Sequence, residues 1–291
     1  MSGFTTGAEQ AVTDLGWVPD GIDTNVPNVA RTYDYLLGGA HNLAVDRELG
    51  DRVLDALPGA RRMARINRSF LRRAVTHLVA SGVDQFLDLG SGIPTAGNVH
   101  EVATRARVAY VDSEPVAVAH ARLLLADVDR ATAVQADLRD PDDVLSRPEV
   151  ADLLDFDRPI GLLLLLALHF VPDSDDPWGV VARYRDRLAP GSHLVVTHAT
   201  ADRRTRAMRD VADSTARTRE RLHYRTRAEV TRLFAGFDLL EPGVTGFALW
   251  RPEGAGDISA DADDNAVAYA GVGVKPTAHP TPDHRARGTL T

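Results

Sequence analysis

Short apolar segments that alternate with helical segments are the feature that most constrains the fold of this chain. Strands that alternate with helices indicate β-α-β units and a parallel sheet that is covered on both faces. The longest apolar segment is almost free of polar residues, which is typical of a strand buried on both faces. The five segments are residues 85–89, 107–112, 132–137, 159–168 and 192–199.

Two further β-like segments, residues 237–242 and 266–274, follow toward the C-terminus and flank a Gly/Pro/Asp-rich loop. With them the sequence predicts one α/β domain over residues 83–276. We expect a Rossmann-like, doubly wound and mostly parallel sheet of seven strands.

The segments outside this domain have different patterns. Residues 1–25 are polar and Gly/Thr-rich, which is typical of a flexible arm. Residues 26–82 carry apolar side chains at helical spacing and predict a helical N-terminal extension. We expect this extension to act as a lid, because the Gly38–Gly39 pair allows a mobile turn. Residues 277–291 are typical of a disordered tail.

Composition narrows the classes of function. The chain has no cysteine, which excludes disulfides and thiolate metal sites and fits a reducing cytoplasm. It shows neither a signal peptide nor an apolar run long enough to span a bilayer. The net charge of -8 disfavours a nucleic-acid partner. We therefore expect a cytoplasmic protein without membrane contacts that acts on a small molecule; assembly into homodimers is compatible with the sequence.

No metal site is expected. His193 and His198 are the histidines nearest to a metal-binding pattern, but they lie five residues apart in a predicted strand and so face opposite sides. No acid–histidine cluster completes a site around either of them.

The turn after the first strand, within FLDLGSGIPT, is the predicted ligand-binding turn. Ligands of doubly wound sheets bind at the carboxyl ends of the strands. Gly90 and Gly92 let the backbone approach a ligand closely, because they have no Cβ atom. The third glycine of a dinucleotide turn is missing, and Pro94 stands in that region. Asp88 would repel a pyrophosphate but can serve a cationic ligand.

Two further acids end the next two strands at similar intervals. Asp112 comes 24 residues after Asp88, and Asp137 comes 25 residues after Asp112. An acid at the tip of the second strand can accept hydrogen bonds from both ribose hydroxyls, and one at the third can accept from an adenine amino group. Helix capping explains any one of them. Three acids, one β-α unit apart, indicate an adenosine ligand with a non-phosphate tail.

At these residues the sequence resembles a known family. The D-L-G-S-G, V-D and A-D-L motifs at the three strand ends look like those of class I S-adenosylmethionine-dependent methyltransferases. NVARTYDYLLGGAHN, LLALHFVPD and VAYAGVGVKP are similar to an actinobacterial subfamily, once a domain of unknown function and now called an S-adenosyl methyltransferase family. The resemblance covers about residues 26–276. It implies S-adenosylmethionine as cofactor and S-adenosylhomocysteine as product.

The resemblance also implies which residues hold the cofactor. Asp112 would bind the ribose, Asp137 the adenine, and the glycine turn the methionine part. Asp88 would face the zwitterionic amino-acid tail, and Arg65 is the candidate cation for its carboxylate, with a solvated side chain as the alternative. The predicted cofactor-binding residues are Asp88, Gly90, Ser91, Gly92, Asp112, Ser113, Asp137, Leu138 and Arg65.

The methyl acceptor is expected near the end of the fourth strand and the end of the first helix. His169 is the candidate general base, with a structural histidine as the alternative. Phe170 is expected to pack against the adenine or the acceptor. Tyr33, His41 and Asn42 are candidate substrate residues, although core packing is the favoured interpretation of Tyr33.

The sequence therefore predicts an S-adenosylmethionine-dependent methyltransferase that methylates an oxygen or nitrogen atom of a small metabolite. A non-catalytic cofactor-binding regulator is the alternative. An NAD(P)-dependent oxidoreductase is less compatible with Asp88 and Pro94, and a nucleic-acid methyltransferase lacks its usual N/D-P-P-Y tetrapeptide. Residues 202–227 carry nine arginines against four acids. We interpret this segment as a solvated helix, with attraction of an acidic substrate as the alternative.

Overall fold

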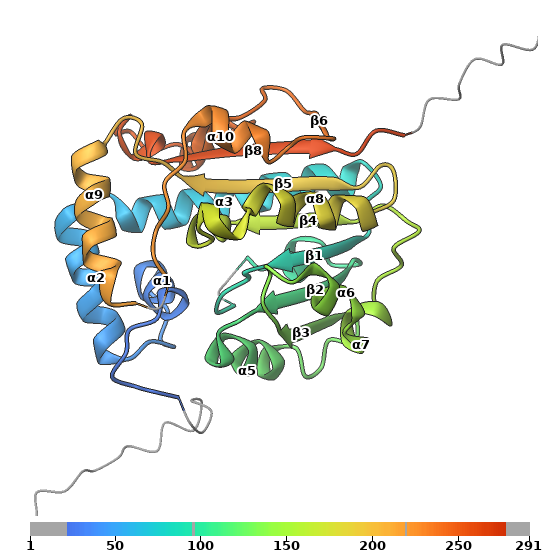
Figure 1. Ribbon diagram of the computed structural model, residues 1–291, viewed down its shortest axis with the longest axis horizontal. Coiled ribbons are helices and arrows are strands. Elements are labelled where there is room, and N and C mark those ends of the chain that lie inside the picture. The colour runs from blue at the N-terminus through green and yellow to red at the C-terminus, as the bar shows by residue number, and fades with distance from the viewer. Residues whose placement is uncertain (1–21, 95–96, 219, 278–291) are drawn as a thin grey trace, which may run out of the picture.

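A single mixed sheet forms the centre of the computed structural model, which describes residues 22–94, 97–218 and 220–277 (Figure 1). Its strands follow the order β3-β2-β1-β4-β5-β8-β6, and β7 also pairs with β8. The strands are β1 (Gln85–Leu89), β2 (Arg107–Asp112), β3 (Ala131–Gln135), β4 (Gly161–Leu165), β5 (His193–Ala199), β6 (Asp238–Leu239), β7 (Thr245–Gly246) and β8 (Ala268–Val274).

The pairing confirms the predicted doubly wound, mostly parallel sheet. Strands β1 to β5 pair in parallel, and β8 runs antiparallel between β5 and β6. The strand order reverses between β1 and β4, because the chain first builds outward to β3 and then returns to the other side of β1. Ligands of this architecture bind at such a switch point, outside the carboxyl ends of the strands.

The predicted number of strands differs from the structure by one. The last position of the sheet, expected as one strand over 237–242, is shared by β6 and β7. Strand β5 pairs with β8 along its whole length. The other edge of β8 pairs with β6 near Val274 and with β7 near Tyr269. Between them the chain turns at Gly243, whose φ of 77° suits a glycine. The sheet therefore has seven positions but eight strands.

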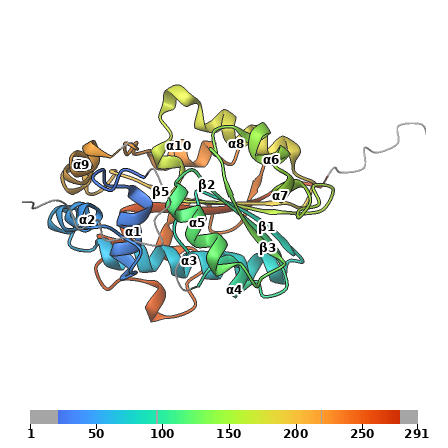
Figure 2. The same cartoon turned by 90° about the horizontal axis from the view of Figure 1, so that it is seen from below.

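Helices cover both faces of the sheet, as Figure 2 shows from below. Alternate strand residues point to opposite faces, so Phe86 joins the core under α3 and Leu87 joins the core under α8. The helices are α1 (Val29–Leu37), α2 (Ala44–Ala56), α3 (Ala60–Ala80), α4 (Val99–Val102), α5 (Pro115–Leu124), α6 (Pro141–Ser146), α7 (Pro148–Ala151), α8 (Pro177–Arg187), α9 (Thr205–Ser214) and α10 (Arg227–Arg232).

The helical N-terminal extension places α1 and α2 beyond the carboxyl ends of β4 and β5, where α2 packs against α9 (Figure 1). Asn28 caps α1 by accepting hydrogen bonds from the backbone N–H groups of Ala30 and Arg31. Gly38, with a φ of 86°, ends this helix. The helix break at Gly38 therefore lets the extension fold back over the edge of the sheet.

The predicted flexible arm and disordered tail lie outside the described residues, apart from residues 22–25 and residue 277. Within the described ranges, no helix is both long enough and apolar enough to cross a membrane.

Candidate functional site

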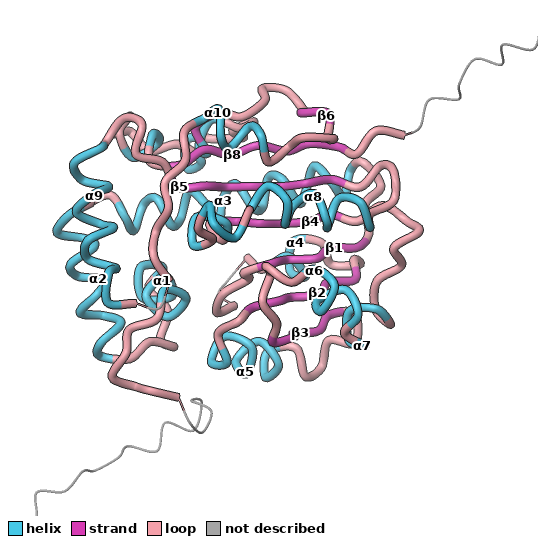
Figure 3. The backbone as a smooth tube through the Cα atoms, in the orientation of Figure 1, coloured by secondary structure: helices cyan, strands magenta, loops and turns pink. Residues whose placement is uncertain are grey.

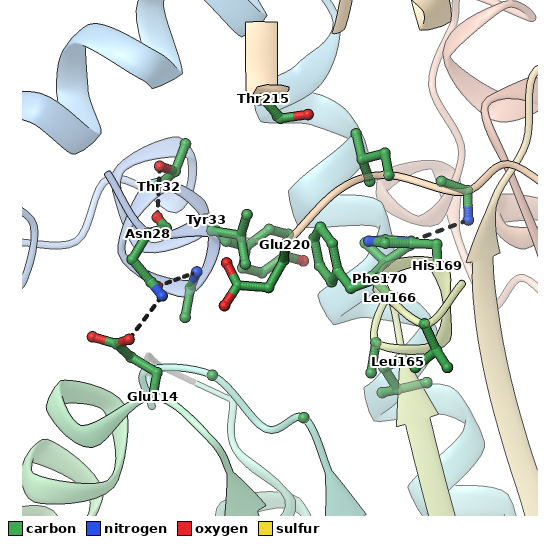
Figure 4. Close-up of a pocket in the computed structure, with 18 of the residues that line it drawn as sticks. Asn28, Thr32, Tyr33, Glu114, Leu165, Leu166, His169, Phe170, Thr215 and Glu220 are labelled. Carbon is green, nitrogen blue, oxygen red and sulfur yellow. Dashed lines mark hydrogen bonds between the residues drawn. The ribbon is translucent and has the colours of Figure 1, made fainter. Parts of the chain in front are cut away.

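A cavity of about 800 Å³ lies at the carboxyl ends of β1 to β4, between the sheet edge and the N-terminal helices (Figure 4). Most of the residues predicted for the site line it. They are Tyr33, Asp88, Gly90, Ser91, Gly92, Asp112, Ser113, Asp137, Leu138, His169 and Phe170.

The glycine turn has a geometry that requires glycine at both positions. Gly90 and Gly92 have φ values of 70° and 65°, in the left-handed region. A Cβ atom on Gly90 would lie 2.6 Å from the Cβ of Ala167. The backbone N–H of Gly90 donates to the carbonyl of Val111 at 2.8 Å, which holds the turn against the end of β2. Glycine is therefore favoured at position 90 by close packing on Ala167 and at both positions by the backbone conformation, and both residues line the cavity.

Asp88 lies below this turn and is 6% exposed. Burial raises the pKa of its carboxyl to about 7, the charge of Asp112 adds to this rise, and the nearby Arg68 opposes it. An additional cation beside Asp88 would stabilise its ionised form. The position therefore suits a ligand with a positive charge, such as the ammonium group of an amino acid.

Asp112 holds the glycine turn with one of its oxygens and the loop that follows β2 with the other. Oδ2 accepts from the backbone N–H of Gly92 at 2.7 Å, and Oδ1 accepts from that of Glu114 at 2.8 Å. Burial raises the pKa of Asp112 even though these N–H groups lower it. A carboxylate has about four acceptor positions, so Asp112 keeps acceptor capacity toward the cavity that it lines.

Asp137 is already engaged by a cation. The Nε–H of Arg139 donates to both of its oxygens, at 3.0 and 2.9 Å, while Nη1 of Arg139 reaches Asp175 at 2.8 Å. Burial alone would raise the pKa of Asp137, but the hydrogen bonds from Arg139 hold it below its usual value. A ligand amino group at Asp137 would therefore have to share this carboxylate with Arg139.

His169 is buried in the turn η1 (Leu168–Phe170) that follows β4. Burial lowers the pKa of its ring well below the usual value, and the charges of His198, Arg225 and His223 act in the same direction. The ring is therefore neutral at physiological pH. Its Nδ1 accepts a long hydrogen bond of 3.4 Å from the backbone N–H of Ala199, which leaves the hydrogen on Nε2. This arrangement favours the structural interpretation of His169 over the general base.

The hydroxyl of Tyr33 belongs to a chain of hydrogen bonds that runs from α1 to the end of β4. Its hydroxyl donates to the carbonyl of Ala64 and accepts from the Nδ2–H of Asn67 at 3.0 Å. Thr197 donates to the Oδ1 of Asn67 at 2.8 Å and accepts from the backbone N–H of Leu166 at 2.9 Å. Leu166 has a φ of 53°, a strained value for a leucine. These hydrogen bonds therefore connect α1 and α3 to the strained residue that follows β4.

Three of the residues predicted for the site, Arg65, His41 and Asn42, do not line the cavity. Arg65 is exposed and lines a separate small pocket beside Ile258. Each residue advances a helix by about 100°, so Arg65 points away from Asn67, whereas Arg68 lines the cavity. Arg68, and not Arg65, is therefore the arginine of α3 that lines the cavity.

His41 and Asn42 organise the turn between α1 and α2 instead of facing the cavity. The Nδ2–H of Asn42 donates to Asp34 and to the carbonyl of Gly39, each at 2.9 Å. The ring of His41 lies against that of His120 on α5, with 3.6 Å between the ring centroids. Asn42 therefore holds the turn itself together, whereas His41 serves the contact between the extension and the sheet domain.

Sequence reasoning missed a wall of the cavity formed by Glu220, Leu222, His223 and Tyr224. Figure 3 shows the loop between α9 and α10, which carries this wall, running along the carboxyl ends of the strands. The arginine-rich segment is thus only partly a solvated helix. One indication of this wall was present in the sequence, because Leu222 and Tyr224 interrupt the run of charged residues after α9.

Arg225 anchors this loop. Its guanidinium is buried and donates to the carbonyls of Leu168 and Val171, at 2.9 and 2.8 Å, and to Asp173 at 2.6 Å. Arg225 also donates to Nε2 of His198 at 2.9 Å. These bonds fix the loop to the end of β4.

Among the described residues, no group of three or more histidine, cysteine or acidic residues could hold a metal ion.

Comparison with known proteins identifies the family. A model of the S-adenosyl methyltransferase family matches residues 16–276. The chain belongs to this family. The resemblance found in the sequence is thereby confirmed, and the cofactor of the family is S-adenosylmethionine. A comparison with curated proteins gives no match.

Two solved structures share the fold of this S-adenosyl methyltransferase family member over most of its length. A DUF574 family protein of Streptomyces avermitilis is 37% identical, with a TM-score of 0.84 over 87% of this chain and 99% of its own. A candidate methyltransferase of Thermobifida fusca is 40% identical, with a TM-score of 0.83 over 90% of this chain and 99% of its own. Residues 83–276 alone could not supply such coverage, so the likeness extends into the helical extension.

Proposed function

We propose that this chain transfers the methyl group of S-adenosylmethionine to an oxygen or nitrogen atom of a small molecule. The observation that carries this proposal is the cavity itself. It joins the glycine turn and the acids of β1 and β2 to a large apolar region between α1, α2, α3 and α9. One end suits the cofactor, and the other leaves room for an acceptor.

In this proposal Asp112 accepts hydrogen bonds from the ribose hydroxyls, and Asp137 with Leu138 contacts the adenine. The backbone of Gly90 and Gly92 lies along the methionine part. Asp88 attracts its ammonium group, and Arg68 takes the place of Arg65 beside its carboxylate. Bound S-adenosylmethionine supplies a methyl group made electrophilic by the sulfonium charge.

The protein's own contribution is alignment and exclusion of water. Phe170 and Leu166 contribute to the wall at the end of β4, and Tyr33 closes the opposite side from α1 (Figure 4). Neutral His169 is proposed to hold this wall in place through Ala199. A role for His169 as general base is kept as the alternative, because its ring lines the cavity.

Calorimetry with S-adenosylhomocysteine and with NAD tests the cofactor part of the proposal. We expect S-adenosylhomocysteine to bind and NAD to fail to compete, because Asp88 and the acidic cavity disfavour a pyrophosphate. Incubation of the protein with methyl-labelled cofactor and a fractionated extract of small metabolites tests transfer. Cofactor binding without label transfer to any fraction would instead support the non-catalytic regulator.

The pH dependence of cofactor binding provides an independent prediction. The affinity for S-adenosylhomocysteine is expected to rise between about pH 5 and pH 8 and then to level off, because the carboxyl of Asp88 must be ionised to attract the ligand's ammonium group. With the pKa of Asp88 raised to about 7 in the free protein, the group is largely protonated at pH 5. Below the pKa the affinity should fall by up to about tenfold per pH unit.

Calorimetry in two buffers of different ionisation enthalpy should detect the proton released on binding at pH 6.5 or below. The Asp88→Asn variant serves as the control, because its amide does not titrate. The role of Asp88 would be contradicted if this variant kept the same pH profile as the unmodified protein.

A further inference from the structure

Glu220 places a carboxylate inside the cavity that the cofactor residues do not explain. Its Oε2 atom is buried and has no hydrogen-bond partner among the described residues. Figure 4 shows the side chain of Glu220 in the space between α1, which carries Tyr33 and is capped by Asn28, and the turn with Phe170. Leaving a carboxylate oxygen both buried and unpaired is unfavourable, so the position suits a ligand that donates to it.

The charges around Glu220 favour a cationic ligand. The negative charge of Glu220 helps to raise the pKa values of Asp112 and Glu114, so these three carboxyl groups lie within electrostatic reach of one another. Arg68 and the exposed Arg221 also line the cavity, whereas two other arginines near its acids are engaged by carboxylates other than Glu220. Arg31 pairs with Asp46 and Glu114, and Arg139 pairs with Asp137 and Asp175.

One part of the cavity wall is apolar. Side chains from α1, α2, α3 and α9 converge on this region, and most are buried. They are Leu36, Leu49, Val53, Leu57, Leu71, Met208 and Val211. A ligand in this region would therefore bury an apolar body and expose to Glu220 one group that carries hydrogen and positive charge.

We propose that Glu220 binds the protonated amino group of an acceptor whose remaining surface is apolar. This inference rests on the proposed function, and it narrows the acceptor from small molecules in general to apolar amines. Glu220 acts here as a specificity-determining residue. A carboxylate recognises an ammonium group through a charge-assisted hydrogen bond, which a neutral hydroxyl cannot match and a second carboxylate would oppose.

The test uses three probes of similar shape, added to the full chain saturated with S-adenosylhomocysteine. The probes are 2-phenylethylamine, 2-phenylethanol and 3-phenylpropanoate, and their dissociation constants are measured by ligand-observed NMR titration. We expect the amine to bind about tenfold or more tightly than the alcohol, and the acid to bind most weakly. The Glu220→Gln variant should bring the amine and the alcohol to within about twofold of each other.

Two measurements separate this inference from its alternatives. The exposed acid variant Glu149→Gln should keep the preference for the amine, and both variants should keep the melting temperature and the S-adenosylhomocysteine affinity. Loss of cofactor affinity in Glu220→Gln would assign Glu220 to the cofactor and overturn the inference. An alcohol that binds as tightly as the amine, or an amine that fails to bind at millimolar concentration, would also overturn it. Failure of the unmodified protein to bind S-adenosylhomocysteine would instead contradict the proposed function.

Discussion

Replacement of Arg31 by alanine is expected to lower the free energy of unfolding by about 3–5 kcal/mol, the range for breaking a buried ion pair from one side. Arg31 is 2% exposed, and its Nε–H donates to Asp46, which is fully buried, at 2.7 Å. Its Nη1 donates to Glu114 at 2.9 Å, and its Nη2 donates to the carbonyl of Val26 at 2.7 Å. The variant would leave two carboxylates without their cation.

Urea unfolding at neutral pH measures this effect, and Arg158→Ala provides the matched control. Arg158 forms an equally short pair of 2.7 Å with Asp84, but both side chains are about half exposed. Loss of such a surface pair costs about 0–1 kcal/mol. Equal losses of stability in the two variants would show that the Arg31 pairs are screened like surface pairs.

Replacement of Asp112 by alanine is expected to weaken the binding of S-adenosylhomocysteine by about 1–3 kcal/mol, or roughly fivefold to 150-fold. Two effects combine in this variant. The ribose hydroxyls lose their proposed acceptor, and the N–H groups of Gly92 and Glu114 lose the acceptor that shapes the turn.

Calorimetry on folded protein measures the change, with circular dichroism to verify the fold. Asp127→Ala is the control, because Asp127 is exposed and lies outside the residues that line the cavity. The proposed role of Asp112 would be refuted by an unchanged dissociation constant in the folded Asp112→Ala variant.

The strands of the sheet were predictable because parallel strands are buried on both faces. Leu162, Leu163 and Leu164 are fully buried, and such a run leaves few alternatives to a central strand. The division of the last sheet position into β6 and β7 was not predictable in the same way. It depends on which parts of residues 237–246 reach the free edge of β8, which is a matter of tertiary pairing.

The acids of the site were predictable because the carboxyl ends of parallel strands meet at one edge. Asp88, Asp112 and Asp137 accordingly line one cavity. Arg65 was placed wrongly with respect to the cavity, since the sequence shows that α3 is amphipathic but not which way each arginine points. Glu220 was not predicted as a site residue, because its place in the cavity depends on how Arg225 anchors its loop. This anchoring is a tertiary contact, which no local sequence pattern shows.

The ion pair between Arg31 and Glu114 joins the N-terminal extension to the sheet domain. Arg31 belongs to the N-terminal extension, whereas Glu114 follows Asp112 by two residues at the end of β2. A chain that began after Arg31 would retain every strand of the sheet yet leave Glu114 and Asp46 without their shared cation. We therefore expect the extension to fold together with the sheet domain rather than as an independent module.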